Sequence, residues 1–309
     1  MDKVRQRDEV RSKRRMTVLT AVDGSRFSQW AIEWLGVLPF LEPLVVHALH
    51  VIDVPRVAIP VLPRPIVITL RPAVRAEVQR LVIHAREVRA DTEKLLVANG
   101  LRGNVRIVRG AVADTIMQRA PRNNGLLALG HRSAEHTDTT RLGGIAARVA
   151  LYAPCSVLVV KQPPRPLRRV LLATDGSITS DEAVGFLCRR IKALLAHPHE
   201  GLIRQHVDVV HVLPKFLEAG VQTMPFVQWA VEQLTRHGYS AEPHVLVGDP
   251  AAEIQAAAAK FSSDLIVVGA TGLGALSRFF LGSVSTRVVQ ESLCTTLVVR
   301  GRHGRGQKT

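Results

Sequence analysis

Cysteine is scarce in this chain, and the few cysteines lie far apart. The 309 residues contain three, Cys155, Cys188 and Cys294. None belongs to a Cys-x-x-Cys pair, which argues against a disulfide framework and against the usual cysteine-rich zinc modules. His197 and His199 form a His-Pro-His pair with no further ligands at a recognisable spacing. We therefore expect no metal site.

Long apolar runs are absent as well. None approaches the roughly 18 residues that a membrane-spanning helix needs, so we expect no membrane segment. The N-terminus is basic but lacks the apolar core of a signal peptide. We therefore expect a cytoplasmic protein.

Sequence motifs of common catalytic sites are missing. The chain has no Walker A loop, no Gly-x-Ser-x-Gly and no His-Glu-x-x-His. His50 and His211 lie near the ends of apolar segments, where we interpret them as structural histidines and not as catalytic bases. No catalytic residue is assigned, and any hydrolytic activity should be weak.

The net charge of +15 is concentrated outside the apolar segments. Residues 1–15, 161–169 and 300–309 each carry a net charge of +4. We interpret them as solvated tails and a solvated linker, with weak attachment to nucleic acid or anionic surfaces as the alternative. Because no aromatic residue is interleaved with these basic clusters, base stacking has no support, and nucleic acid is not an expected partner.

An internal repeat organises the rest of the chain. Short apolar segments run into Asp-Gly-Ser at 23–25 and again at 175–177, and helical patterns follow, the second over Ser180–Leu195. Cys155 and Cys294 begin near-identical apolar segments that lie 139 residues apart. Each half alternates apolar strands with helices, which predicts an α/β fold of two tandem, doubly wound, five-stranded parallel-sheet domains.

Segment 53–71 distinguishes the first half from the second. Its four prolines disfavour a helix or a central strand, so we predict an apolar flap or partner-contact loop. The predicted organisation is a basic tail (1–15), a first domain (16–160), a linker (161–168), a second domain (169–300) and a basic tail (301–309).

The second half contains the motif Gly269-x2-Gly272-x9-Gly282-Ser283. Gly269 and Gly272 would let the backbone approach a ligand without a Cβ in the way. Gly282 and Ser283 would open a helix whose first N–H groups lack intrahelical partners and can bind phosphate. Ser283 or Ser285 could cap this helix or donate to a phosphate. The alternative is a glycine loop followed by an ordinary serine cap.

Together these motifs resemble the universal stress protein family, with two members in tandem between Thr17 and Val299. The nucleotide-binding members of that family carry G-x2-G-x9-G-[ST]. The resemblance implies a Rossmann-like, adenine nucleotide α-hydrolase-like fold that binds ATP, with Mg²⁺ as a candidate companion ion. It assigns Asp175 to the adenosine, the backbone of Val212 to the adenine, Val268, Gly269 and Gly272 to the ribose and phosphates, and Gly282, Ser283, Val284 and Ser285 to the phosphates.

The first half departs from this pattern. Its motif is Gly130-x2-Ser133-x9-Gly143-Gly144, in which one serine adds a Cβ and one glycine removes a hydroxyl donor. We therefore predict one ATP site per chain, in the second domain. A weak second site would use Asp23, Val51, Gly130, Ser133, Gly143 and Gly144.

The leading hypothesis is a regulatory or stress-response protein that binds ATP and hydrolyses it slowly at most, since no base or arginine finger is identifiable. The alternatives are a nucleotide-independent interaction scaffold and an enzyme of a related adenine-nucleotide fold. The resemblance also implies an intrachain pseudo-dimer formed by the last strands, 155–160 and 294–299, with a homodimer of two chains as a further step.

Overall fold

The structure, a computed structural model, describes residues 15–53, 64–122, 125–132, 142–193, 205–214, 224–272 and 281–301. The strands of the first half are β1 (Met16–Ala21), β2 (Leu44–Ile52), β3 (Arg102–Arg109), β4 (Leu126–Gly130) and β5 (Ser156–Val160). Those of the second half are β6 (Arg169–Ala173), β7 (His206–Leu213), β8 (Ser240–Val247), β9 (Leu265–Gly269) and β10 (Thr295–Val299).

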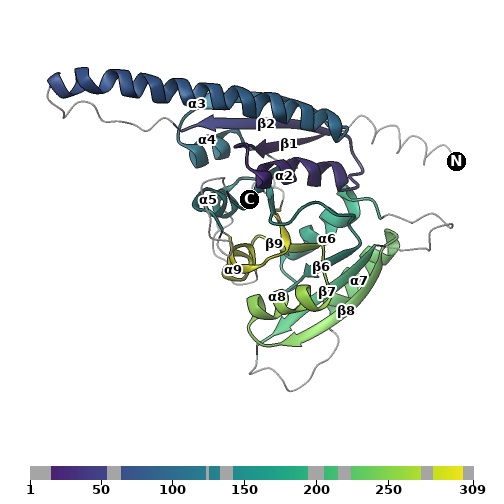
Figure 1. Cartoon of the computed structure of the whole chain (residues 1–309). Helices are drawn as coiled ribbons and strands as arrows, with labels where there is room; N and C mark the ends of the chain where they lie inside the picture. Colours follow the sequence, from purple (N-terminus) through teal and green to yellow (C-terminus); the bar gives the residue numbers. More distant parts are fainter. Residues whose placement is uncertain are drawn as a thin grey trace, which may run out of the picture.

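The helices cover both faces of the sheet that these strands form (Figure 1). Among the described residues, none of them combines the length and the apolar character needed to cross a bilayer. In the first half they are α2 (Arg26–Val37), α3 (Arg64–Ala98), α4 (Val112–Arg119) and α5 (Gly144–Tyr152). In the second half they are α6 (Ile178–Arg190), α7 (Pro225–Arg236), α8 (Pro250–Lys260) and α9 (Ser283–Glu291).

The strand order is β3-β2-β1-β4-β5-β10-β9-β6-β7-β8. Within each half all neighbouring strands are parallel, and the order reverses beside the first strand of the half, as in a doubly wound sheet. This confirms the predicted fold class. The apolar character of the strands follows from their position, because helices cover them on both faces.

The two halves join through the antiparallel pair β5–β10. Leu158 lies opposite Leu297, and Val157 lies opposite Val298. Every residue of both strands is buried. The two five-stranded sheets are therefore one continuous ten-stranded sheet in the described residues.

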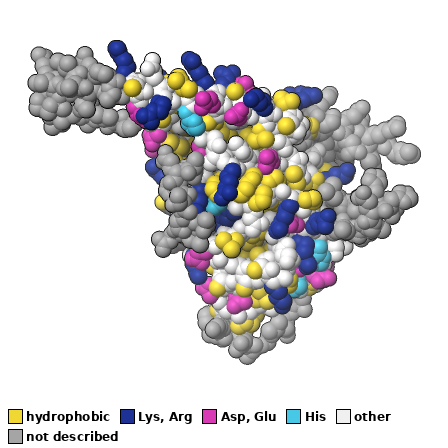
Figure 2. Space-filling model, viewed as in Figure 1, with side chains coloured by type: hydrophobic (Ala, Val, Ile, Leu, Met, Phe, Trp, Pro, Cys, Tyr) yellow, Lys and Arg dark blue, Asp and Glu magenta, His cyan; other side chains and the backbone are white. Residues whose placement is uncertain are grey.

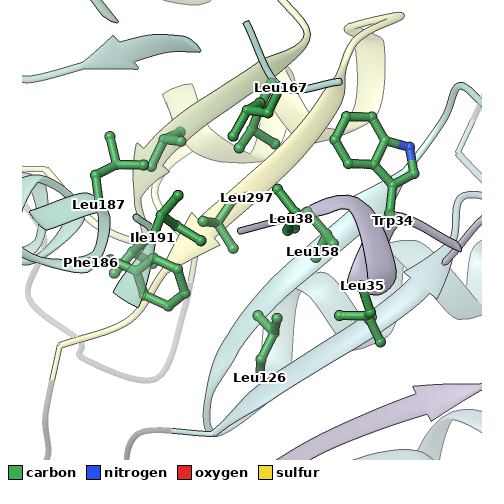
Figure 3. Packing of buried hydrophobic residues seen from close by; sticks show 14 of the residues in the cluster. Trp34, Leu35, Leu38, Leu126, Leu158, Leu167, Phe186, Leu187, Ile191 and Leu297 are labelled. Atoms are coloured by element: carbon green, nitrogen blue, oxygen red, sulfur yellow. The ribbon is translucent and has the colours of Figure 1, made fainter. Parts of the chain in front are cut away.

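The hydrophobic core on one face of the sheet crosses this junction without interruption (Figure 3). Leu158 and Leu297 pack there with Leu38, which follows α2, and with Phe186 and Ile191 from the region of α6. Leu158 is fully buried and Leu297 is 3% exposed. A second cluster on the opposite face also contains residues of both halves. Neither half therefore has a core of its own.

Two cations, Lys161 and Arg300, cross the junction in opposite directions. The Lys161 ammonium donates a hydrogen bond to the carbonyl of Ser292, at the C-terminus of α9. Arg300 Nη2 donates to the carbonyls of Ala150 and Leu151 in α5, at 2.7 and 2.8 Å. A positive charge at a helix C-terminus is stabilised by the carbonyl groups that have no intrahelical partner. Each half therefore supplies a cation that pairs with carbonyl groups at the C-terminus of the other half's last helix.

The linker is docked onto the second domain. Arg165 Nε lies 2.5 Å from Asp264 Oδ1, and Asp264 Oδ2 accepts hydrogen bonds from the N–H groups of Arg168 and Arg169, both at 2.8 Å. The prediction of a solvated linker is therefore wrong for Lys161, which is half-buried and hydrogen-bonded to Ser292, whereas Arg165 is exposed and pairs with Asp264 at the surface. On the face seen in Figure 2, lysine and arginine side chains are spread among acidic and apolar ones.

The prediction of a loop over 53–71 is wrong for its second part. Residues 64–71 begin the 35-residue helix α3, which contacts β2 and β3 (Figure 1). Pro65 lies in the first turn, where a proline removes an N–H that would have no intrahelical partner. Residues 54–63 lie outside the described residues.

The predicted end of the helix at Leu195 is also wrong. Helix α6 ends at Arg190, and Ile191 leaves it to form an isolated antiparallel bridge with Phe40 of the first half. The adjacent N–H of Leu41 donates to the carbonyl of Arg190 at 2.8 Å. A contact between the halves, which no local pattern encodes, therefore ends this helix.

The shared core predicts that the two halves unfold together. We expect Leu158→Ala to lower the free energy of unfolding by about 2–5 kcal/mol, because it leaves a cavity in the core. Urea unfolding followed by circular dichroism should remain one transition. The control Val97→Ala, at a side chain that is 79% exposed, should change stability by less than about 0.5 kcal/mol. Two separate transitions, only one of which the substitution shifts, would contradict a shared core.

The position of Lys161 predicts a specific pH dependence. Burial lowers the pKa of its ammonium group from 10.5 to about 8. Between these values the unfolded chain binds the proton and the folded chain releases it, so this group increases stability as the pH rises from about 8 to 10.5. The stability of the wild type relative to Lys161→Met should therefore rise over that range, by at most about 1.4 kcal/mol per pH unit. Urea midpoints at several pH values measure it, and a constant difference would refute the assignment.

Candidate functional site

A cavity of about 650 Å³ lies at the carboxyl ends of β6, β7 and β9. Strand order reverses between β6 and β9, which is where ligands bind in doubly wound sheets. The N-terminus of α9 closes one side of it. The structure brings all the residues predicted for the second-domain site to this cavity: Asp175, Val212, Val268, Gly269, Gly272, Gly282, Ser283, Val284 and Ser285.

The Asp-Gly-Ser turn after β6 begins the site. Gly176 has a φ of +75°, which only glycine adopts without strain, so the chain can turn sharply into α6. Ser177 then caps α6, since its hydroxyl oxygen accepts from the N–H of Ser180 at 3.3 Å. The Ser177 N–H donates to Asp175 Oδ1 at 3.0 Å, which orients the carboxylate at the edge of the cavity.

Gly269 and Gly272 make room for other parts of the protein. A Cβ at Gly269 would lie 2.6 Å from Thr179 Oγ1 and 2.8 Å from the backbone nitrogen of Ser180, so this glycine lets α6 pack against the end of β9. A Cβ at Gly272 would lie 2.6 Å from Asp175 Oδ2. The sequence analysis attributed both glycines to ligand approach, and it missed these packing constraints.

Gly282 differs from the other two glycines. Among the described residues, a Cβ there would meet only ordinary contacts, at 3.4 Å from the Cα of Thr271 and at 3.5 Å from two further backbone atoms. Its backbone is extended, with φ −64°, which any residue adopts. The fold itself therefore does not require glycine at this position. Its backbone lines the cavity, where a glycine leaves room for the close approach of a ligand.

Helix α9 presents its N-terminus to the cavity. Gly282 is its N-cap, and no described side chain caps it, so of the two alternatives for Ser283 and Ser285 the serine cap is not the one found. The N–H groups of its first turn therefore lack intrahelical acceptors at the cavity wall, where an anion would be stabilised. Ser283 is exposed, whereas the hydroxyl of buried Ser285 donates to the carbonyl of Gly269 at 2.6 Å. Ser283 is thus the better placed hydroxyl donor.

Sequence reasoning missed part of the lining. The apolar wall includes Val210 and Ile254, and the polar wall includes Ser177 and Thr271. Ser177 belongs to the repeated Asp-Gly-Ser tripeptide, which could have indicated it. His211 also lines the cavity, and its Nδ1 lies 2.8 Å from the carbonyl oxygen of Thr174.

The first half keeps the same backbone arrangement. Gly24 has a φ of +82°, Ser25 caps α2, and its N–H donates to Asp23 Oδ1 at 3.0 Å. Gly143 is the N-cap of α5 and donates to the carbonyl of His131 at 2.8 Å, as Gly282 does to that of Ala270. Gly130 and Gly144 end β4 and begin α5, Val51 lies in β2, and Ser133 lies outside the described residues.

The side chains of the first half differ at three matching places. His131 and Arg132 follow β4 and are 8% and 6% exposed, where the second half has Ala270 and Thr271. The ring of Phe27, at the place of Thr179, meets that of His131 edge-on, with centroids 4.4 Å apart. Burial, followed by the charge of Arg132, lowers the pKa of His131 to about 4, so this imidazole is neutral near pH 7. Bulky side chains therefore stand where the second-domain site has small ones.

The chain resembles proteins of known family in sequence and in fold. A universal stress protein of Mycolicibacterium smegmatis is 26% identical over 303 residues, which cover 92% of this chain and 97% of that protein. One of Synechocystis is 31% identical over 99 residues, and the match spans 58% of its length. The crystal structure of a universal stress protein from Archaeoglobus fulgidus shares the fold at 18% identity, with a TM-score of 0.66, covering 93% of this chain and 97% of that one.

The family model of the universal stress protein family matches the chain twice, over residues 15–161 and 166–300. The first match covers the sheet from β1 to β5, and the second covers it from β6 to β10. Because these two matches span nearly all of the described structure, this chain belongs to the universal stress protein family, as a tandem two-domain member.

Proposed function

We propose that the chain is a regulatory stress protein that binds one ATP molecule in the cavity of its second domain. The observation that carries the proposal is Gly282, because none of the described residues around it requires a glycine there and the cavity borders its backbone. The volume of about 650 Å³ lies within the usual range for a small-molecule site.

The lining has two chemically different parts, which match the two ends of ATP. Val210, Val212 and Ile254 provide an apolar wall suited to an adenine ring. The α9 N-terminus offers N–H groups and the exposed hydroxyl of Ser283, which suit the phosphates. In this arrangement Asp175, held by the turn before α6, would accept hydrogen bonds from the ribose hydroxyls or hold a hydrated Mg²⁺.

The same side chains give no support for efficient hydrolysis. A fast phosphoryl transfer needs a residue that orients the attacking water and a cation that stabilises the charge of the transition state. Among the described residues that line the cavity there is no lysine or arginine. We therefore propose binding with slow turnover at most, which suits a regulatory role.

The alternative is an interaction scaffold that needs no nucleotide. In that case the glycine–serine loop is only the start of a helix, and the β5–β10 junction is the main functional feature. We propose this junction as an intrachain pseudo-dimer. A measurement of nucleotide binding distinguishes directly between the ATP-binding protein and the scaffold.

Replacement of Gly282 tests the site. We expect Gly282→Val to abolish ATP binding while the melting temperature changes little, because the neighbouring atoms tolerate a Cβ and the position is outside the core. Ser283→Ala should weaken binding by about 1–3 kcal/mol, the scale of a hydrogen bond to a charged group. Calorimetric titration of the wild type with ATP should give one site per chain. Gly143→Val, the matching change in the first half, should leave the affinity unchanged. Normal folding of Gly282→Val with unchanged ATP affinity would favour the scaffold.

The first half offers the converse experiment. We expect Ser133→Gly with Gly144→Ser to leave its nucleotide affinity low, because His131 and Arg132 still occupy the region after β4. Adding His131→Ala and Arg132→Thr, the residues of the second half, should produce a second titratable ATP site. The double variant and the variant with all four changes are both made in a chain that also carries Gly282→Val. Calorimetry then measures ATP binding by the first half alone. Equal binding by the two forms would show that the buried side chains do not block this site.

A further inference from the structure

A cluster of polar side chains lies at the amino-terminal ends of β7 and β8, at the opposite end of these strands from the ATP cavity. Asp208 lies opposite Glu242 in the parallel register, and His206 and His244 lie two residues away on their own strands. Alternate residues of a strand point to the same face of the sheet, so these four side chains share one face. Asp208 is 1% exposed, which is uncommon for a carboxylate unless it has partners.

Two hydrogen bonds and one longer contact bring the side chains of the cluster together. His206 Nε2 and His244 Nε2 lie 3.2 and 2.9 Å from Asp208 Oδ1. Glu242 Oε2 lies 3.9 Å from His206 Nε2, and ligand atoms of His206, Asp208 and Glu242 all lie within 4.8 Å of one another. A tetrahedral ion with ligands at about 2.0–2.2 Å places them roughly 3.3–3.6 Å apart. The ligand atoms of His206, Asp208 and Glu242 therefore lie within reach of one ion, and His244, which contacts Asp208 Oδ1, is the fourth candidate ligand.

We propose that His206, Asp208, Glu242 and His244 bind a divalent transition-metal ion, and that Zn²⁺ is the best chemical match. Two imidazole nitrogens with carboxylate oxygens suit zinc, whereas Mg²⁺ and Ca²⁺ prefer oxygen ligands alone. This site is independent of the ATP site in its residues and in its place on the sheet.

Surrounding residues orient the ligands. Ser240 Oγ lies 3.1 Å from His206 Nδ1, a contact that leaves Nε2 directed at the centre of the cluster. Arg169 Nη2 donates to Asp208 Oδ2 at 3.3 Å, so the other oxygen, Oδ1, stays with the histidines. Such outer contacts are typical of metal sites, where they fix the tautomer and the direction of each ligand.

The charge balance of the cluster also favours a cation. Asp208 and Glu242 contribute two negative charges, and Arg169 compensates one of them. The two carboxylates therefore outnumber the one guanidinium that contacts them, and oxygen and imidazole nitrogen atoms are available to a divalent ion. The side chains of His206, His244 and Glu242 are 19%, 24% and 64% exposed, so the ion can enter from solvent on the side of Glu242.

The first half shows that the fold itself does not require this cluster. The matching positions in β2 and β3 are Val45, His47, Asn104 and Arg106, with Val45 and Arg102 in the register of His206 and Ser240. Only one histidine and no carboxylate remain there. The four ligands are therefore particular to the second half.

A metal ion at this place would connect the last two strands of the sheet. Strand β8 lies at the edge and pairs only with β7 in the described sheet. An ion held by residues of both strands would link that edge to the interior. Because the ligands come together only in the folded chain, binding would raise the stability of the folded state.

The test is titration of the full-length chain with ZnCl₂ after removal of bound metal by EDTA. We expect one Zn²⁺ per chain by calorimetry and a rise in melting temperature with added zinc. Ser240→Ala should weaken binding by about tenfold, the scale for removal of an outer contact. His206→Gln and His244→Gln should weaken it by more than that and abolish the rise in melting temperature.

Two controls separate this site from other histidines. His84→Gln changes an exposed histidine of the first half, and the double change His197→Gln with His199→Gln removes the His-Pro-His pair. Both should bind zinc as the wild type does. Glu242→Gln, at an exposed side chain, keeps the test valid if a histidine variant fails to fold, and it should also weaken binding. Absence of stoichiometric binding, or binding that follows the His-Pro-His pair and not the four ligands, would overturn the proposal.

Discussion

The pairing of β5 with β10 is the constraint on which the rest of the structure depends. Each half ends in a strand whose residues are all buried, and such a strand cannot remain at a solvent-exposed edge without risking association with other chains. Pairing the two edges hides both of them. It also brings α2 and α6 over one shared core, and it places Lys161 and Arg300 where each reaches a helix end of the opposite half.

Because this pairing holds the halves together, the side chains at the carboxyl ends of the strands can differ between the halves without loss of the fold. Both halves keep the glycine turn after the first strand, the serine cap and the glycine before the last helix. What differs is a few side chains, since His131 and Arg132 stand at the places of an alanine and a threonine, and Gly144 at the place of Ser283. The scaffold supplies the position of a cavity, whereas the side chains around it set its size and chemistry.

The two ends of the second-half sheet offer different chemistry for a physical reason. At the carboxyl ends, glycines and a helix N-terminus expose backbone N–H groups, which attract anions. At the amino ends of β7 and β8, imidazoles and carboxylates meet on one face, which favours a cation. Asp208 and Asp175 therefore lie at opposite ends of the sheet, in surroundings of different chemistry.

The sequence by itself determined the repeat, the strands and the residues that gather at the cavity. These follow from local signals: apolar runs such as Leu44–Ile52, which coincides with β2, and turn tripeptides that place Asp175 at a strand end. Tertiary structure alone decided that Gly272 lies against the carboxylate of Asp175, where α6 ends, and that His206 lies beside Glu242. Each of these depends on contact between residues distant along the chain, and such contacts arise from the packing of the whole sheet, which no local spacing records.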